Sequence, residues 1–151
     1  MQTRSLNATL IALAVSRRAL FAANNCISCH GKADWASSKL NLLGAMPVLK
    51  DALRDLGTFI ATAPNELKQN GTIAAGAFGL DPPSLPGVAG LAPYLDNGSA
   101  QTLEDLMSLK QHRTAGLAAG AAYPFDNPAN LADIVKFLEV IDTGTQPFPI
   151  P

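Results

Sequence analysis

Apolar residues in this chain recur at intervals of three and four, the spacing of an α-helix with one buried side. The spacing predicts a first helix over residues 5–23. Its expected stripe consists of Leu6, Leu10, Leu13, Arg17 and Phe21. A last helix is predicted from Pro128 to Ile141, with Asn127 as N-cap and Pro128 at the first helical position. Its stripe consists of Leu131, Ile134, Val135, Leu138 and Ile141.

Two further helices are predicted between these. The first runs from Pro47 to Leu56, with Gly57 just past its end. The second begins at Thr102, where Thr102 and Asp105 have the spacing of a capping box, and ends near His112 to Gly116. No convincing strand pattern is present, so the expected fold class is all-α.

Residues 57–101 lack a helical pattern and are punctuated by glycine and proline. A connection of this length is uncommon in a compact domain and is usually functional, so we expect it to wrap a bound group. The segment Pro82 to Pro86 should be extended, because each proline fixes φ and disfavours helix before it. The tail from Thr143 to Pro151 is also expected to be extended.

Composition narrows the function. With 151 residues the chain is most simply one domain, spanning residues 1–151. A net charge of -1 gives no electrostatic case for nucleic-acid binding. No apolar run reaches the length of a membrane span, so no transmembrane segment is expected. Leu6 to Val15 lacks the order of a signal peptide, and we interpret it as part of the first helix.

Both cysteines of the chain fall in the sequence Cys26-Ile27-Ser28-Cys29-His30. Two thiols two residues apart, followed at once by an imidazole, are the attachment motif of a c-type haem. The motif predicts that the thiols form thioethers to the two vinyl groups and that His30 supplies the proximal nitrogen to iron. A thioredoxin-like redox pair is disfavoured because no alternation of strands and helices surrounds the motif. A zinc site would need two more ligands, and only one other histidine remains.

A second axial ligand would decide much of the function. The candidates are His112, Met107, Met46, Lys110 and Tyr94, and an open site is the remaining alternative. His112 is favoured as the only other histidine, followed by Met107. Trp35 lies five residues beyond His30 and has two interpretations. It packs in the core, or it donates its indole N–H to a haem propionate.

Residues 83–99, PSLPGVAGLAPYLDNGS, and the following Thr102-Leu103-Glu104-Asp105-Leu106 carry a family resemblance. They resemble the C-terminal haem domain of the bacterial di-haem cytochrome c peroxidase superfamily, which includes oxygenases. The resemblance covers most of residues 17–142. It implies a cytochrome c-like domain of about four helices with long haem-wrapping loops. It also implies that Pro86, Tyr94, Met107 and Arg113 contact the haem.

Departures from the family pattern affect the ligand assignment. Pro86 replaces an arginine, Asp96 replaces the usual histidine, and Lys110 stands where the peroxidases have a methionine ligand. The segment from His112 to Gly116 resembles the oxygenase-like branch, in which a later histidine precedes a glycine-containing turn. The enzymes of the superfamily use two haems, whereas this chain has one attachment motif.

The expected function is therefore electron transfer by one covalent haem, passing electrons to a redox protein or within a larger cytochrome complex. The alternative is a haem peroxidase or oxygenase subunit with an open or displaceable sixth site. A haem-bearing structural subunit of a larger assembly is a third alternative, compatible with electron transfer. Because such haems are attached outside the cytoplasm, a periplasmic or extracellular location is expected. The chain is then a mature form or one segment of a longer precursor.

Overall fold

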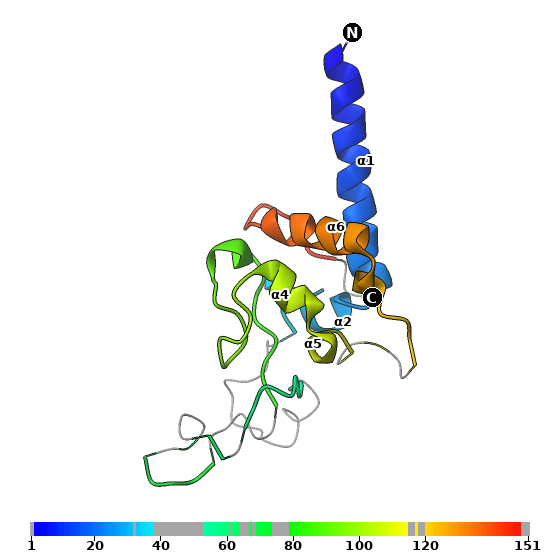
Figure 1. Ribbon diagram of the computed structural model, residues 1–151. Helices are drawn as coiled ribbons and strands as arrows, with labels where there is room; N and C mark the ends of the chain where they lie inside the picture. Colours follow the sequence, from blue (N-terminus) through cyan, green and yellow to red (C-terminus); the bar gives the residue numbers. More distant parts are fainter. Residues whose placement is uncertain are drawn as a thin grey trace.

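The structure is a computed structural model, and its described part comprises residues 2–31, 33–37, 53–60, 62–63, 67, 69–73, 79–114, 117 and 120–148. Within these ranges the regular elements are helices, joined by three isolated bridges and no strand. The predicted all-α class is confirmed to that extent. The principal helices are α1 (Gln2–Ala23), α2 (Ile27–His30), α4 (Leu103–Ser108), α5 (Lys110–Thr114) and α6 (Pro128–Glu139) (Figure 1).

Helix α1 extends the predicted first helix by three residues at its start and ends at residue 23, as predicted. Asn24 closes the last turn by donating its side-chain amide to the Leu20 carbonyl, at 2.8 Å. Asn25 then adopts a positive φ of 55°, which asparagine tolerates better than most residues. The chain therefore turns sharply before Cys26.

Only the C-terminal half of α1 packs against the rest of the described structure; the N-terminal half projects away from it (Figure 1). Leu10 and Leu13 of the predicted stripe are exposed, whereas Phe21 is buried. The expected burial of the stripe is therefore wrong at Leu10 and Leu13. Alanine and leucine, which recur in this half, have high intrinsic helix propensity, and this favours α1 there without a neighbour in the described residues.

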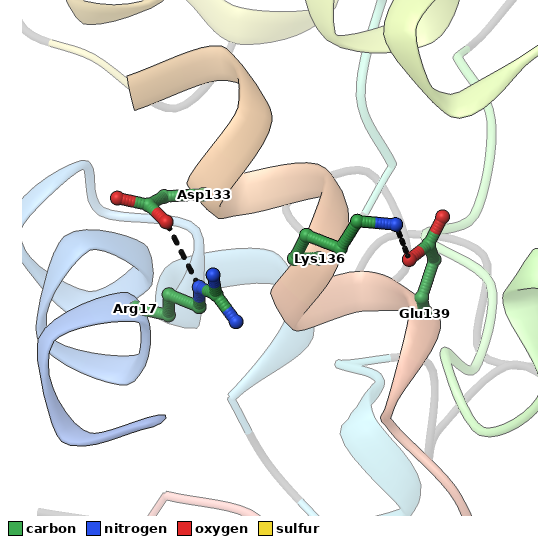
Figure 2. A network of polar contacts seen from close by, with 4 residues as sticks. All are labelled: Arg17, Asp133, Lys136 and Glu139. Atoms are coloured by element: carbon green, nitrogen blue, oxygen red, sulfur yellow. Dashed lines mark hydrogen bonds and ion pairs between the residues drawn. The ribbon is translucent and has the colours of Figure 1, made fainter. Parts of the chain in front are cut away.

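Helix α6 crosses the C-terminal half of α1 and carries much of the core (Figure 1). Its start confirms the prediction, because the Asn127 side chain accepts a hydrogen bond from the Ala129 N–H at 2.9 Å and Pro128 follows. An ion pair of 2.9 Å joins Arg17 of α1 to Asp133 of α6 (Figure 2). The buried side chains of α6 are Ile134, Val135, Phe137 and Leu138.

Four aromatic rings form the centre of the packing between α1, α6 and the returning tail. The Phe21 ring stacks on Phe148 at a centroid distance of 5.7 Å and lies 5.3 Å from Phe137. Trp35 meets Phe21 edge-on at 5.7 Å. Each such pair contributes about 0.5–1.5 kcal/mol beyond the area it buries. The tail is thus folded onto the core by Phe148.

The predicted helix beginning at Thr102 is interrupted. Its capping box is confirmed, since Thr102 and Asp105 exchange side-chain to backbone hydrogen bonds of 3.0 Å. Leu109 has extended backbone angles, however, and separates α4 from α5. The Met107 carbonyl in the last turn of α4 accepts a hydrogen bond from the Tyr123 hydroxyl. A contact from a distant loop thus holds the end of α4, and this contact is not encoded in the local pattern.

Most of the helix predicted over Pro47 to Leu56 lies outside the described residues. Its last four residues are not helical; Arg54 instead pairs with Leu80 through two backbone hydrogen bonds of 2.8 Å. The described parts of residues 57–101 contain turns, bridges and one 3₁₀ turn, Val88–Gly90. This agrees with the predicted irregular stretch.

Candidate functional site

A cavity of about 430 Å³ opens between α2, α4, α5, α6 and the loop containing Pro83. This volume lies in the range of small-molecule and cofactor sites. Its walls are mainly apolar and include Leu85, Val88, Leu103, Leu106, Ile134 and Leu138. The sulfur and imidazole side chains on the cavity wall are Cys26, Cys29, Met107, His30 and His112. Its charged side chains are Arg54, Asp81, Asp96 and Arg113.

The cysteine–histidine motif forms one helical turn. The His30 N–H donates to the Cys26 carbonyl at 2.8 Å, and the Cys29 N–H does so at 3.2 Å. Side chains three and four positions apart lie on one side of a helix, so both thiols and the imidazole border the same cavity. Both cysteines are free thiols. The motif therefore presents two nucleophilic sulfurs and one ring nitrogen to a single space.

His30 is held by a loop far away in sequence. Its Nδ1 lies 3.1 Å from the Pro83 carbonyl oxygen. A hydrogen bond from Nδ1–H to a backbone carbonyl fixes the ring tautomer and leaves the lone pair on Nε2. Many metal-bound histidines have this arrangement. Burial lowers the pKa of His30, while the Pro83 carbonyl acts in the opposite direction. The neutral imidazole required of a ligand is thereby favoured.

His112 contributes a second imidazole to the cavity from α5. Its Nδ1 is buried and has no hydrogen-bond partner. Burial lowers the pKa of His112 to about 4, with smaller contributions from the charges of His30 and Arg113. A buried ring nitrogen without a partner costs about 1–3 kcal/mol, so a ligand that pairs with it would remove that cost.

Met107 lies on the same cavity wall and is 3% exposed. Of the other axial candidates, Tyr94 borders the cavity, but its hydroxyl donates to the Val88 carbonyl at 3.0 Å. Lys110 is exposed, pairs with Asp126 at 3.4 Å and is not among the cavity-lining residues. Met46 lies outside the described residues. The structure therefore brings His112 and Met107 to the cavity with His30.

Trp35 lies in the aromatic core and not on the cavity wall. It is 1% exposed, and its indole N–H donates to the Thr145 carbonyl at 3.1 Å. The donor is thus engaged by the tail, and Trp35 is not among the cavity-lining residues. Its packing in the aromatic core accounts for its burial. Pro86 also does not line the cavity, whereas Pro82 and Pro83 do.

Arg113 is almost fully buried, at 4% exposed, and borders the cavity beside Cys26. One guanidinium nitrogen lies 3.6 Å from the Cys26 sulfur, and another donates to the Asn24 carbonyl at 3.2 Å. The Arg113 guanidinium carbon is 4.8 Å from the centroid of the Phe125 ring. Arg113 thus connects α5 to the turn that precedes the motif.

Sequence reasoning missed the Pro83 carbonyl and the apolar walls on α4 and α6. The expectation of an extended proline segment pointed to the right loop but not to its acceptor atom. His30 and Pro83 are 53 residues apart, and no local pattern encodes that contact.

No group of three or more His, Cys, Asp or Glu side chains in the described ranges is placed to hold a metal ion. Among the helices described, none is both long and apolar enough to cross a membrane. No family model, curated protein or solved structure matches the chain.

Proposed function

We propose that the chain is a c-type cytochrome that transfers single electrons through one covalently bound haem. The observation that carries the proposal is the convergence of two free thiols and two half-buried imidazoles on one mainly apolar cavity. The thiols belong to the attachment motif and lie one helical turn apart. The proposed partner is a redox protein, and the proposed location is the periplasm or the cell exterior.

The residues present fit this cofactor. Cys26 and Cys29 would hold it by thioethers, and His30 would ligate the iron with its Nε2 because Nδ1 faces the Pro83 carbonyl. His112 fits the second axial position, since its ring borders the same cavity as His30 and is neutral near pH 7. The apolar walls suit a porphyrin, which is itself largely apolar. The bound haem supplies an iron centre that gains and loses one electron.

Two axial side chains would leave no open position for a substrate on iron, which favours transfer over catalysis. The apolar walls also exclude water, which lowers the reorganisation that accompanies each change of charge. The identity of the second ligand sets the range of the reduction potential. A methionine in place of histidine raises that potential, so His112 predicts a lower value than Met107 does.

Absorption spectroscopy of the haem-loaded protein tests the proposal. We expect a low-spin spectrum that cyanide and peroxide do not change. His112→Ala should convert the spectrum to a high-spin, cyanide-binding form. Met107→Leu, a matched change that keeps an apolar side chain of similar size, should leave it low-spin.

A high-spin, ligand-binding iron in the unaltered protein would contradict the proposal and favour the peroxidase or oxygenase alternative. Conversion to high spin by Met107→Leu alone would keep electron transfer but move the ligand to Met107. A purified protein without haem would overturn the proposed function altogether.

A further inference from the structure

The side chain of Arg113 is a buried cation without a carboxylate partner in the described part of the chain. The three ion pairs found there involve Arg17, Lys110 and Lys136 instead. Arg113 is 4% exposed, its Nε is buried without a hydrogen-bond partner, and its other contacts are to neutral groups.

Such an arrangement is costly by itself. A buried charge normally requires a paired opposite charge, and a carbonyl, a thiol and an aromatic ring compensate only in part. The Phe125 ring, whose centroid lies 4.8 Å from the guanidinium carbon, offsets part of that cost by a cation–π interaction. A neutral side chain would fill the same space with less penalty, so the positive charge at this place calls for an explanation.

The location of Arg113 offers an explanation for its positive charge. The guanidinium contacts the Cys26 sulfur, and His112, the preceding residue of α5, lines the same cavity. Asp81 and Asp96 also line this cavity, but neither forms an ion pair with Arg113. The charge of Arg113 acts on Cys26 and His112, lowering the pKa of His112 and opposing the burial that raises the pKa of Cys26. In an apolar interior with a low effective dielectric, a charge is felt over a longer distance than in water.

We propose that Arg113 raises the reduction potential of the haem by placing an unneutralised positive charge beside it; this inference rests on the proposed function. Reduction adds one electron from a one-electron donor to the iron, and no bond forms or breaks. The added negative charge is stabilised by a nearby cation, and arginine keeps its proton at any working pH. Burial and local charge are recognised determinants of haem potentials.

The position of Arg113 relative to the thiols strengthens the inference. In a c-type haem the thioethers join the vinyl edge of the porphyrin, and the two propionates leave from the opposite edge. Arg113 contacts the Cys26 sulfur and therefore lies on the vinyl side. Arg113 would therefore not form the direct ion pair with the propionates that would neutralise its charge.

Spectroelectrochemical titration of the haem-loaded full chain with dye mediators tests the inference. Arg113→Gln removes the charge, and we expect its potential to fall by the equivalent of at least a tenfold change in the reduction equilibrium, 59 mV for one electron. Arg113→Lys keeps the charge and should retain most of the wild-type value. Arg18→Gln is the matched control, because that arginine lies over the Phe148 ring and does not line the cavity.

An unchanged or higher potential in Arg113→Gln, with the spectrum still low-spin, would overturn the inference. An equal fall in Arg113→Lys would also overturn it, because the effect would then come from shape rather than charge. If Arg113→Gln fails to take up haem, Arg113→Met decides the question by the same criterion, since apolar replacement of a buried charge is often tolerated. Absence of haem from the wild-type protein would instead refute the proposed function.

Discussion

Acidification of the haem-loaded protein should leave its iron coordination intact until well below the range in which histidine normally titrates. Burial lowers the pKa of His112 to about 4 from a usual value of 6.5. The charged form of the ring is therefore penalised in the fold by about 3 kcal/mol, at 1.36 kcal/mol for each pH unit. The ring stays neutral, and able to bind iron, in conditions where an exposed histidine would be largely protonated.

The sign of the linked stability follows from the same shift. A histidine with a folded-state pKa below its unfolded value disfavours folding when it must take up a proton. This destabilisation is absent above pH 6.5 and grows as the pH falls from 6.5 towards about 4. Iron ligation, if His112 is the proposed ligand, would hold the ring in its neutral form and lower the apparent midpoint further.

Visible absorption measured from about pH 8 down to about pH 3 at constant ionic strength follows this transition. We expect a constant low-spin spectrum to about pH 5 and conversion to high spin at or below about pH 4. Met107→Leu should show the same curve, whereas His112→Ala should be high-spin throughout. A transition with a midpoint between about pH 6 and 7 would refute the reasoning, because His112 would then titrate like an exposed side chain.

Three further predictions concern the packing that surrounds the cavity, each measured by urea denaturation of the haem-loaded protein. Phe21→Ala should lower the free energy of unfolding by about 3–5 kcal/mol, because the ring is buried in the core. Ile11→Ala, on the exposed half of the same helix, should change it by less than about 0.5 kcal/mol. Equal effects of the two substitutions would contradict the packing described. Asn127→Ala should cost about 1 kcal/mol through loss of the α6 cap, and Asn127→Asp should restore most of it. Arg17→Ala should lower the free energy of unfolding by less than about 1 kcal/mol, because the ion pair with Asp133 is partly solvent-exposed. In 1 M salt the difference between the two proteins should shrink. A decrease above about 2 kcal/mol would contradict this reasoning.

Local signals allowed several elements to be predicted from the sequence. The cap of α6 and the capping box of α4 depend on residues within four positions of each other, so short patterns encode them. The same holds for the motif, since one helical turn is enough to bring Cys26, Cys29 and His30 to one side. The two caps formed as expected, whereas the short helix α2 of the motif was not among the predicted helices.

Contacts between distant segments could not be predicted in this way. The Tyr123 hydroxyl at the end of α4, beside the break at Leu109, comes from a loop that follows α5. The Thr145 carbonyl that engages Trp35 is 110 residues away in sequence. Similarly, the helical pattern of α1 could not show that only its second half has a neighbour in the described structure. Propensity determines whether a helix forms, while the rest of the fold determines what it contacts.

The candidate site also combines residues that local patterns predict with contacts that only the fold creates. Residue types identified the two thiols, His30 and the axial candidates, and the structure brought His112 and Met107 to the cavity with them. The role of the Pro83 carbonyl and the isolation of the Arg113 charge emerged only from the folded arrangement. Both depend on which groups are excluded from water, and a sequence pattern does not specify that.

Intact-mass measurement of the denatured, purified chain, produced in a host that attaches c-type haem, tests the central claim most directly. Thioethers survive denaturation, so the account predicts the mass of the polypeptide plus one haem. Cys26→Ala combined with Cys29→Ala should return the mass of the polypeptide alone. The bare polypeptide mass in the unaltered protein would contradict the account.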